Sequence, residues 1–349
     1  MNCFRSFSKG SMVVVLHLVL LTLGQPVFAD EPPIPLIDAH NQYDGTFQHE
    51  DILRFMDRYG IGRMILAPAA RADDRALVQF GAQHTDRLTI AVRTKDRRLI
   101  RNGDAGGIVD EVQRGGYGAF EELLLWHADK GGTKGVAESQ VSGGEITLDI
   151  AGATVRELVD VARRRNWPMI PHIEFASAGA KGPELMKQFE ALLASNRDVS
   201  FGLIHRGQLD EGEARRLIGI HPNVFFLLSQ STDPRKARIG FTSIVSSQAL
   251  DSDWLALIRA HPDRFVLSFD AFSGRLWTEQ MARETGIWRT ILTKLPLEVA
   301  HAVGHGNAER LWRLPPTPPL AANNSSLPLG PRAPAANTPT EGRQKGRGR

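Results

Sequence analysis

The feature that most constrains this chain is a series of short apolar runs, nearly all of them followed by a segment with helical periodicity. Eight such runs occur, at Ile34–His40, Arg63–Ala67, Leu88–Arg93, Ala119–Trp126, Pro168–Glu174, Val199–His205, Val224–Leu228 and Arg264–Asp270. Continuous apolar runs, as opposed to alternating ones, are typical of strands buried on both faces of a parallel sheet.

The segments between these runs predict helices. Residues 50–60 and Thr154–Arg164 carry apolar residues at helical spacing, and Pro183–Ser195 and Asp251–Ala260 behave likewise. No Gly-x-Gly-x-x-Gly motif follows the first strand, which weakens a dinucleotide-binding alternative. Strand–helix alternation repeated eight times predicts an α/β fold, a closed (β/α)8 TIM barrel, in preference to an open doubly wound sheet.

The first 29 residues have the pattern of a secretory signal peptide. Arg5 and Lys9 precede an apolar stretch at Met12–Leu23, and small residues end at Ala29. The apolar stretch is short for a transmembrane helix, so we expect cleavage before Asp30 and no stable membrane span afterwards. This predicts a periplasmic or secreted protein, with an uncleaved N-terminal anchor as the alternative.

The only cysteine, Cys3, lies in this leader. A mature chain without cysteine forms no disulfide and offers no thiolate nucleophile. Any metal ion would therefore be bound through nitrogen and oxygen.

The C-terminal residues 315–349 are rich in Pro, Ala, Asn, Ser and Thr, and we expect them to be a disordered tail. The leader contributes a charge of +2 and the tail +4, so the total of +3 leaves −3 for residues 30–314. The basic character thus belongs to the ends, and the folded body gives no argument for nucleic-acid binding. The expected organisation is a signal peptide (1–29), a barrel (30–314) and a tail (315–349).

Ionisable side chains lie at the ends of four predicted strands: His40, His172, His205 and Asp270. In a parallel barrel the C-terminal ends of all strands meet at one face, so residues far apart in sequence converge there. Imidazole and carboxylate groups suit zinc or a similar divalent ion.

These residues, in this order and with this strand placement, resemble the amidohydrolase superfamily. The matching segments are Asp38-Ala39-His40, His172, His205, Asp270 and a closing Gly306-Asn307-Ala308-Glu309-Arg310-Leu311. The similarity is to the branch that contains metal-dependent hydrolases and aromatic-acid decarboxylases. It implies a TIM barrel with a divalent metal, most often zinc, and a small-molecule substrate.

The resemblance also implies roles for individual residues. The implied metal ligands are His40, Gln42, Glu122, His172 and Asp270. Asp270 would also be the catalytic base, and His205 would contact the substrate or an activated water. Each histidine alone also fits a structural reading as a buried, hydrogen-bonded side chain, and Asp270 fits a helix cap.

Gln42 is the main departure, because the family usually has a His-x-His pair on the first strand. A carboxamide is a weak oxygen donor compared with imidazole, so we expect weaker metal binding. Strand alternation predicts that Gln42 and His40 face the same side. Of the adjacent Glu121 and Glu122 only one should point inward, and the family register favours Glu122; a carboxylate paired with a lysine or arginine is the alternative reading.

Arg206 directly follows His205 and is a candidate for binding a substrate carboxylate. The long segment His127–Ile150 is a candidate cover over the site. The predicted function is a metal-dependent hydrolase acting on an amide, ester or lactone. A non-oxidative decarboxylase and a catalytically impaired binding protein are the alternatives. The substrate, the number of metal ions and homo-oligomerisation stay open.

Overall fold

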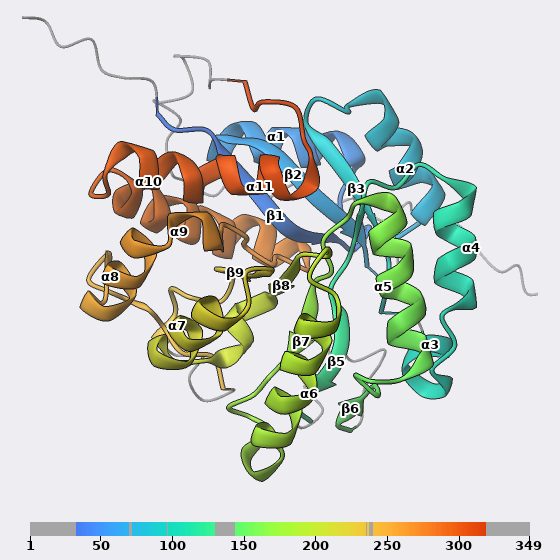
Figure 1. Ribbon diagram of the computed structural model, residues 1–349. Coiled ribbons are helices and arrows are strands. Elements are labelled where there is room, and N and C mark those ends of the chain that lie inside the picture. The colour runs from blue at the N-terminus through green and yellow to red at the C-terminus, as the bar shows by residue number, and fades with distance from the viewer. Residues whose placement is uncertain are drawn as a thin grey trace, which may run out of the picture. The chain divides into compact units, whose positions relative to one another are not determined.

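Strands in the computed structural model form a barrel with helices around it (Figure 1). The structure describes residues 33–69, 72–95, 97–129, 144–234, 236 and 240–318. The barrel strands are β1 (Leu36–Tyr43), β2 (Ile61–Pro68), β3 (Leu88–Val92), β4 (Ala119–Phe120), β5 (Leu123–His127), β7 (Pro171–Ile173), β8 (Phe201–Leu203), β9 (Val224–Leu227) and β12 (Phe265–Val266). Strands β4 and β5 are two parts of one barrel strand that is interrupted at Glu121–Glu122. Counted in this way, the barrel has eight strands, one for each apolar run predicted from the sequence.

Parallel pairing joins these strands in chain order, and backbone hydrogen bonds close the circle. The ladders run β1-β2-β3-β4, then β5-β7, then β8-β9-β12. The Met169 N–H donates to the Ser200 carbonyl at 2.9 Å, and this hydrogen bond joins the segments that lead into β7 and β8. The Ala39 N–H of β1 donates to the carbonyl of Leu267, which follows β12, at 3.0 Å, and this hydrogen bond joins the last barrel strand to the first. The fold is therefore a (β/α)8 barrel, as predicted.

Helices form at all four segments named from the sequence, 50–60, 154–164, 183–195 and 251–260, and seven further helices occur among the described residues. In chain order the helices are α1 (His49–Tyr59), α2 (Asp74–Gln83), α3 (Arg97–Asn102), α4 (Gly106–Arg114), α5 (Ala153–Arg165), α6 (Gly182–Ser195), α7 (Glu211–Ile220), α8 (Ser252–Ala260), α9 (Gly274–Leu292), α10 (Leu297–His301) and α11 (Asn307–Trp312). A short strand β6 (Ile146–Thr147) pairs antiparallel with β5, and β10 (Val245–Ser246) forms a hairpin with β11 (Ala249–Leu250).

The apolar core has two layers. The inner layer fills the barrel with Ile37, Ala39, Ile65, Ala67, Ala91, Ala119, Ile170, Ile204, Phe225, Leu227 and Val266. Trp312 of α11 belongs to this layer and meets Phe225 edge to face, with ring centroids 5.8 Å apart. A larger outer layer packs the helices against the strands. Because Phe225 lies at the start of β9, α11 packs at the end of the barrel opposite the strand C-termini.

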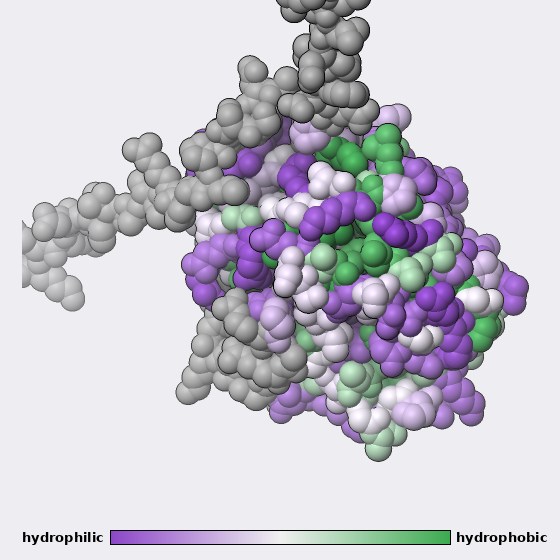
Figure 2. Space-filling view, turned by 90° about the vertical axis from the view of Figure 1, so that its left-hand side faces the viewer, coloured by the Kyte–Doolittle hydropathy of each residue, from purple (hydrophilic) through white to green (hydrophobic). Residues whose placement is uncertain are grey.

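Apolar residues are thus mostly inside. Two large hydrophobic side chains are exposed among the described residues, Ile220 and Leu297. On the face shown in Figure 2, hydrophobic residues are surrounded by hydrophilic ones. No helix in the described part of the chain is long and apolar enough to span a bilayer. The predicted signal peptide lies outside the described residues, as does most of the predicted cover, at residues 130–143.

The described residues continue past the predicted boundary between barrel and tail at residue 314. Thr317 is buried, and its N–H donates to Glu309 Oε1 at 2.6 Å. This contact ties the segment after α11 to that helix, so ordered structure continues beyond Leu314. Tail residues 319–349 lie outside the described residues.

Candidate metal centre

A β-bulge in β1 determines which side chains reach the C-terminal mouth of the barrel. The register against β2 shifts between Asp38, which pairs with Met64, and Asn41, which pairs with Leu66. One extra residue in β1 reverses the alternation. Ile37 and Ala39 therefore face the barrel interior before the bulge, whereas His40 and Gln42 face the mouth after it.

Asp38 holds this bulge in place. Its Oδ2 accepts a hydrogen bond from Asn41 Nδ2 at 2.7 Å. Its Oδ1 accepts from the backbone N–H groups of His40, at 3.3 Å, and Phe269, at 3.0 Å. The same carboxyl thus links the bulge to the segment that presents Asp270. Burial outweighs these hydrogen bonds and raises the pKa of Asp38 to about 7.

On the opposite side of the mouth, the site residues follow very short strands and have left-handed backbones. The φ angle is 51° at His205, after β8, 58° at Gln230, after β9, and 55° at Asp270, after β12. Such conformations are disfavoured for residues with a Cβ and gather at functional sites. Here they turn each side chain back over the barrel mouth as its strand ends.

His40, Glu122 and Asp270 form the centre of the cluster. His40 Nε2 lies 3.5 Å from Asp270 Oδ1 and 3.7 Å from Glu122 Oε1. This nitrogen is buried and makes no hydrogen bond. Burial disfavours the imidazolium, but the carboxylates of Asp270 and Glu122 outweigh it and raise the pKa of His40.

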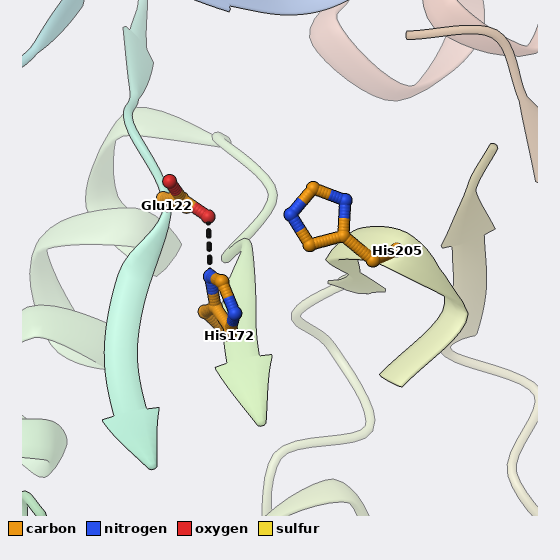
Figure 3. Close-up of side chains that lie close together, drawn as sticks. All are labelled: Glu122, His172 and His205. Atoms are coloured by element: carbon orange, nitrogen blue, oxygen red, sulfur yellow. Dashed lines mark hydrogen bonds and ion pairs between the residues drawn. The ribbon is translucent and has the colours of Figure 1, made fainter. Parts of the chain in front are cut away.

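His172 lies beside this centre and is bound by two carboxylates. Its Nδ1 is 2.6 Å from Glu122 Oε2 and its Nε2 is 3.2 Å from Glu174 Oε1. Figure 3 shows the contact with Glu122 and the imidazole of His205 approaching from the neighbouring segment. Burial lowers the pKa of His172, but the two glutamates outweigh burial and raise it to about 9. To coordinate a metal ion, His172 would have to lose a proton and one carboxylate partner.

Asp270 is held by carboxamides on both oxygens. Gln42 Nε2 donates to Oδ1 at 3.3 Å, and Gln230 Nε2 donates to Oδ2 at 2.8 Å. The oxygen of Gln230 in turn accepts from the Lys236 ammonium. Burial raises the pKa of Asp270, but His40 and His205 outweigh burial and lower it. Asp270 is therefore ionised and fixed in direction.

His205 is oriented by a hydroxyl group. Its Nδ1 lies 2.8 Å from Ser229 Oγ, and its Nε2 lies 3.6 Å from Asp270 Oδ2. The ring also meets His172, with centroids 5.1 Å apart. The second ring nitrogen consequently faces the same centre as His40 and His172.

The paired glutamates differ as the alternation predicted, although both are buried. Glu122 faces the histidines, whereas Glu121 Oε2 accepts from the Thr94 N–H at 3.1 Å. The Lys95 ammonium pairs with Glu122 Oε1 and lies 3.8 Å from Glu121 Oε1. Burial raises the pKa of Glu122, but Lys95 and His172 outweigh it and hold the pKa well below its usual range.

Arg206 points away from this cluster. It is buried and bonds to Ser231 Oγ and, at 2.6 Å, to the Thr242 carbonyl oxygen. Its guanidinium carbon lies 5.4 Å from the centroid of the Trp254 ring. Burial lowers the pKa of Arg206 to about 10. These contacts give it a structural role, and its predicted contact with a substrate carboxylate stays a prediction.

The donor set at the centre fits a divalent ion. Donor atoms of His40, Glu122 and Asp270 all lie within 4.8 Å of one another, as do those of Glu122, His172 and His205. Around a tetrahedral ion with bonds of about 2.0–2.1 Å, neighbouring donors are separated by about 3.3 Å. The distances from His40 to its two carboxylates are close to this value, and the unbonded Nε2 of His40 is aimed between them. Gln42 lies next to this position, because its Nε2 donates a hydrogen bond to Oδ1 of Asp270.

Comparison with known proteins defines the class. The amidohydrolase family model matches residues 37–314, so the chain belongs to the amidohydrolase family. A comparison with curated proteins finds no significant match.

Solved structures show the same fold at low sequence identity. An uncharacterized TIM-barrel protein from Bordetella bronchiseptica is 12% identical with a TM-score of 0.54, covering 80% of this chain and 99% of that one. A candidate 2-pyrone-4,6-dicarboxylic acid hydrolase from Pseudomonas putida is 15% identical with a TM-score of 0.51, covering 80% and 98%. An amidohydrolase from Burkholderia multivorans with bound HEPES is 14% identical with a TM-score of 0.50, covering 80% and 100%. At these identities the likeness concerns the fold.

The site residues His40, His172, His205 and Asp270 were predicted from the sequence, but several residues around them were not. Lys95, Glu174 and Gln230 contact residues of the cluster, and Lys236 contacts Gln230. Lys95 and Gln230 each follow a predicted strand by two residues, and Glu174 ends a predicted run. The signal that identified His205 and Asp270, a polar residue at a strand end, therefore also applied to them.

Proposed function

We propose that this chain is a metal-dependent hydrolase acting on a small-molecule amide, ester or lactone. The observation that carries the proposal is the buried Nε2 of His40, which lies 3.7 Å from Glu122 Oε1 and 3.5 Å from Asp270 Oδ1. A buried nitrogen donor between two anionic oxygens is the arrangement that a divalent cation stabilises. Zinc is the ion of choice for this mixture of imidazole and carboxylate ligands.

His40, Glu122 and Asp270 would hold the ion, with His172 and Gln42 as further ligands. When bound, such an ion would supply a Lewis acid that polarises a substrate carbonyl and makes an attacking water more acidic. Asp270 accepts the proton of the attacking water on one carboxylate oxygen and later delivers it to the leaving group. The amides of Gln42 and Gln230 keep that carboxylate pointed at the centre during both transfers.

His205 binds the substrate oxygen that becomes negatively charged. Its Nδ1 is engaged by Ser229, so Nε2 is the atom that faces the reaction centre. Burial of the cluster excludes water and strengthens every one of these polar contacts.

The decarboxylase alternative is less well supported. It requires a guanidinium that holds the carboxylate of the acid, and Arg206, the residue nominated for this, is turned to Ser231 and Thr242. The binding-protein alternative rests on Gln42 and would be favoured if the chain bound metal but turned over nothing.

The proposed cellular location rests on the signal-peptide pattern of residues 1–29. The expectation of a periplasmic or secreted protein is part of the proposal, and a small-molecule substrate fits the buried centre. Detection of the mature protein starting at Asp30 in an exported fraction would test this part.

The catalytic proposal is tested by hydrolysis in 18O-labelled water. Protein stripped with a chelator is reloaded with Zn2+ or Mn2+ and incubated with a panel of lactones, esters and amides. We expect metal-dependent turnover with one 18O in the acid product, and a loss of at least about 100-fold in Asp270→Asn. Asp253→Asn, on the exposed face of α8, is the matched control and should keep full activity. Carbon dioxide release without 18O incorporation would favour decarboxylation, and absence of any metal-dependent turnover would contradict the proposal.

A further inference from the structure

A lysine occupies the position next to the candidate metal centre. Lys95 lies just after β3, and its ammonium pairs with Oε1 of Glu122. Only 12% of its side chain is exposed, so the charge is largely removed from bulk water.

The segment that carries Lys95 is fastened to both glutamates of the interrupted strand. The N–H of Thr94 donates to Glu121 Oε2 at 3.1 Å, and its hydroxyl donates to the carbonyl oxygen of Glu122. Thr94 is itself buried. These contacts fix the backbone next to Lys95, so its ammonium is directed at Glu122 by the local structure.

The oxygen that Lys95 contacts is also the one that completes the candidate metal centre. Glu122 Oε1 lies 3.7 Å from the unbonded Nε2 of His40. The other oxygen of Glu122 is engaged by His172 at 2.6 Å. A divalent ion between His40 and Asp270 would therefore have to share Oε1 with the ammonium or displace it, and the two positive charges would repel each other across a buried site.

We infer that Lys95 is the resident counter-ion of Glu122 and competes with the divalent metal for this carboxylate. The inference rests on the metal site of the proposed function and adds how its occupancy is regulated. Lys95 compensates the buried Glu122 when metal is absent. It also lowers metal affinity when metal is present, independently of the missing histidine at position 42.

The test is an equilibrium titration of Zn2+ against a chromophoric chelator at fixed pH. Lys95→Met should raise Zn2+ affinity at least about tenfold, because it removes the competing charge while keeping similar bulk. Lys95→Arg keeps the charge and should stay close to wild type. Lys181→Met removes an exposed lysine that pairs with Glu145 and should have no effect. If Lys95→Met does not fold by circular dichroism, the neutral Lys95→Gln has the same expected result.

A double-mutant cycle shows whether the effect passes through Glu122. In a Glu122→Gln background, Lys95→Met should leave Zn2+ affinity unchanged within about twofold. His301→Asn is measured in parallel, because His301 Nδ1 and His305 Nε2 lie 3.1 Å apart near the C-terminal helix and such a pair can chelate added metal. Ions bound there are then counted separately.

The outcomes separate this inference from the proposed function. Wild-type protein that binds Zn2+ with no gain in Lys95→Met overturns the role of Lys95 and leaves the metal-dependent function intact. Binding in Lys95→Met but not in wild type supports the role of Lys95 and contradicts a metal-dependent reaction of the natural chain. Absence of binding in both proteins overturns both proposals.

Discussion

The two sides of the barrel mouth present their site residues by different means. On one side, β1 and β2 are eight residues each and paired along their length, and a bulge turns His40 and Gln42 towards the mouth. On the other side, β8 has three residues and β12 has two. There, left-handed residues and side-chain hydrogen bonds place His205 and Asp270.

This difference shows where the structure stores strain. The first side has two register shifts, at Leu36–Ile37 and at Asp38–Asn41, and the carboxyl group of Asp38 holds the second of them in place. The second side combines positive φ angles with buried polar groups: the four residues His205–Gln208 in succession have left-handed φ angles of 51–64°. We therefore expect the first side to fail through loss of one hydrogen-bonded anchor, and the second side to respond to charge and backbone changes.

Asp38→Ala should give the largest effect. It leaves the backbone N–H groups of His40 and Phe269 and the amide of Asn41 without their acceptor, and each buried unsatisfied group costs about 1–3 kcal/mol. We expect a loss of more than about 3 kcal/mol in the free energy of unfolding, measured by urea denaturation. Asp44→Ala removes only local hydrogen bonds to Thr46 and should cost about 1 kcal/mol. Equal effects of the two variants would show that the bulge does not depend on Asp38.

Glu284→Gln, a substitution on the second side of the mouth, should change how the free energy of unfolding depends on pH. Glu284 of α9 is fully buried, and burial, only partly offset by Lys236 and Arg283, raises its pKa to about 7 from 4.5. A raised carboxyl pKa gives stability that is complete below the unfolded pKa and is lost as pH rises through the folded pKa. We expect the variant to gain up to about 3 kcal/mol over wild type at pH 8, and little at pH 4. Denaturation curves at the two pH values measure this, and a pH-independent difference would contradict the account.

Gly207→Ala should show the strain of the left-handed turn. Gly207 has a φ of 64°, and a Cβ there would meet Phe175 at 3.0 Å. We expect a loss of about 1–3 kcal/mol in thermal or chemical unfolding. Gly219→Ala in α7 is the control, because a Cβ there meets nothing within 4 Å and should stabilise by about 0.5–1 kcal/mol. Stabilisation by both substitutions would show that the turn is unstrained.

Gln42→His should have the smallest effect, a change in Zn2+ affinity, and it tests whether residue 42 on the first side of the mouth can bind metal. The side chain of residue 42 already reaches Asp270, so an imidazole there can add a ligand next to His40. We expect Zn2+ affinity to rise about tenfold, or about 1.4 kcal/mol, in the same chelator titration. Unchanged affinity would place residue 42 outside the coordination sphere.

The fold could be predicted from the sequence because apolar runs and helical periodicity are local signals. All eight predicted runs overlap a strand of the barrel. The convergence of His40, His172, His205 and Asp270 also followed, since parallel strands share one mouth. The positions of Gln42 and Glu122 followed from alternation and the family register.

Other features depend on tertiary contacts that no local pattern contains. The bulge at Asp38 is stabilised by a partner 231 residues away, Phe269, and the left-handed residue His205 is held by Ser229, 24 residues further along the chain. The pairing of Lys95 with Glu122 likewise requires β3 and the interrupted strand to be adjacent. Arg206 was proposed as a substrate contact from its place in the sequence, and its contact with Trp254 depends on tertiary packing that this place does not reveal.

The most direct test of the central claim is anomalous diffraction from crystals soaked in Zn2+. The account predicts a peak at the barrel mouth about 2.0–2.2 Å from His40 Nε2 and from a carboxylate oxygen of Asp270, with the Lys95 ammonium moved away from Glu122. A mouth without an anomalous peak at millimolar Zn2+, with Lys95 still paired to Glu122, would contradict it.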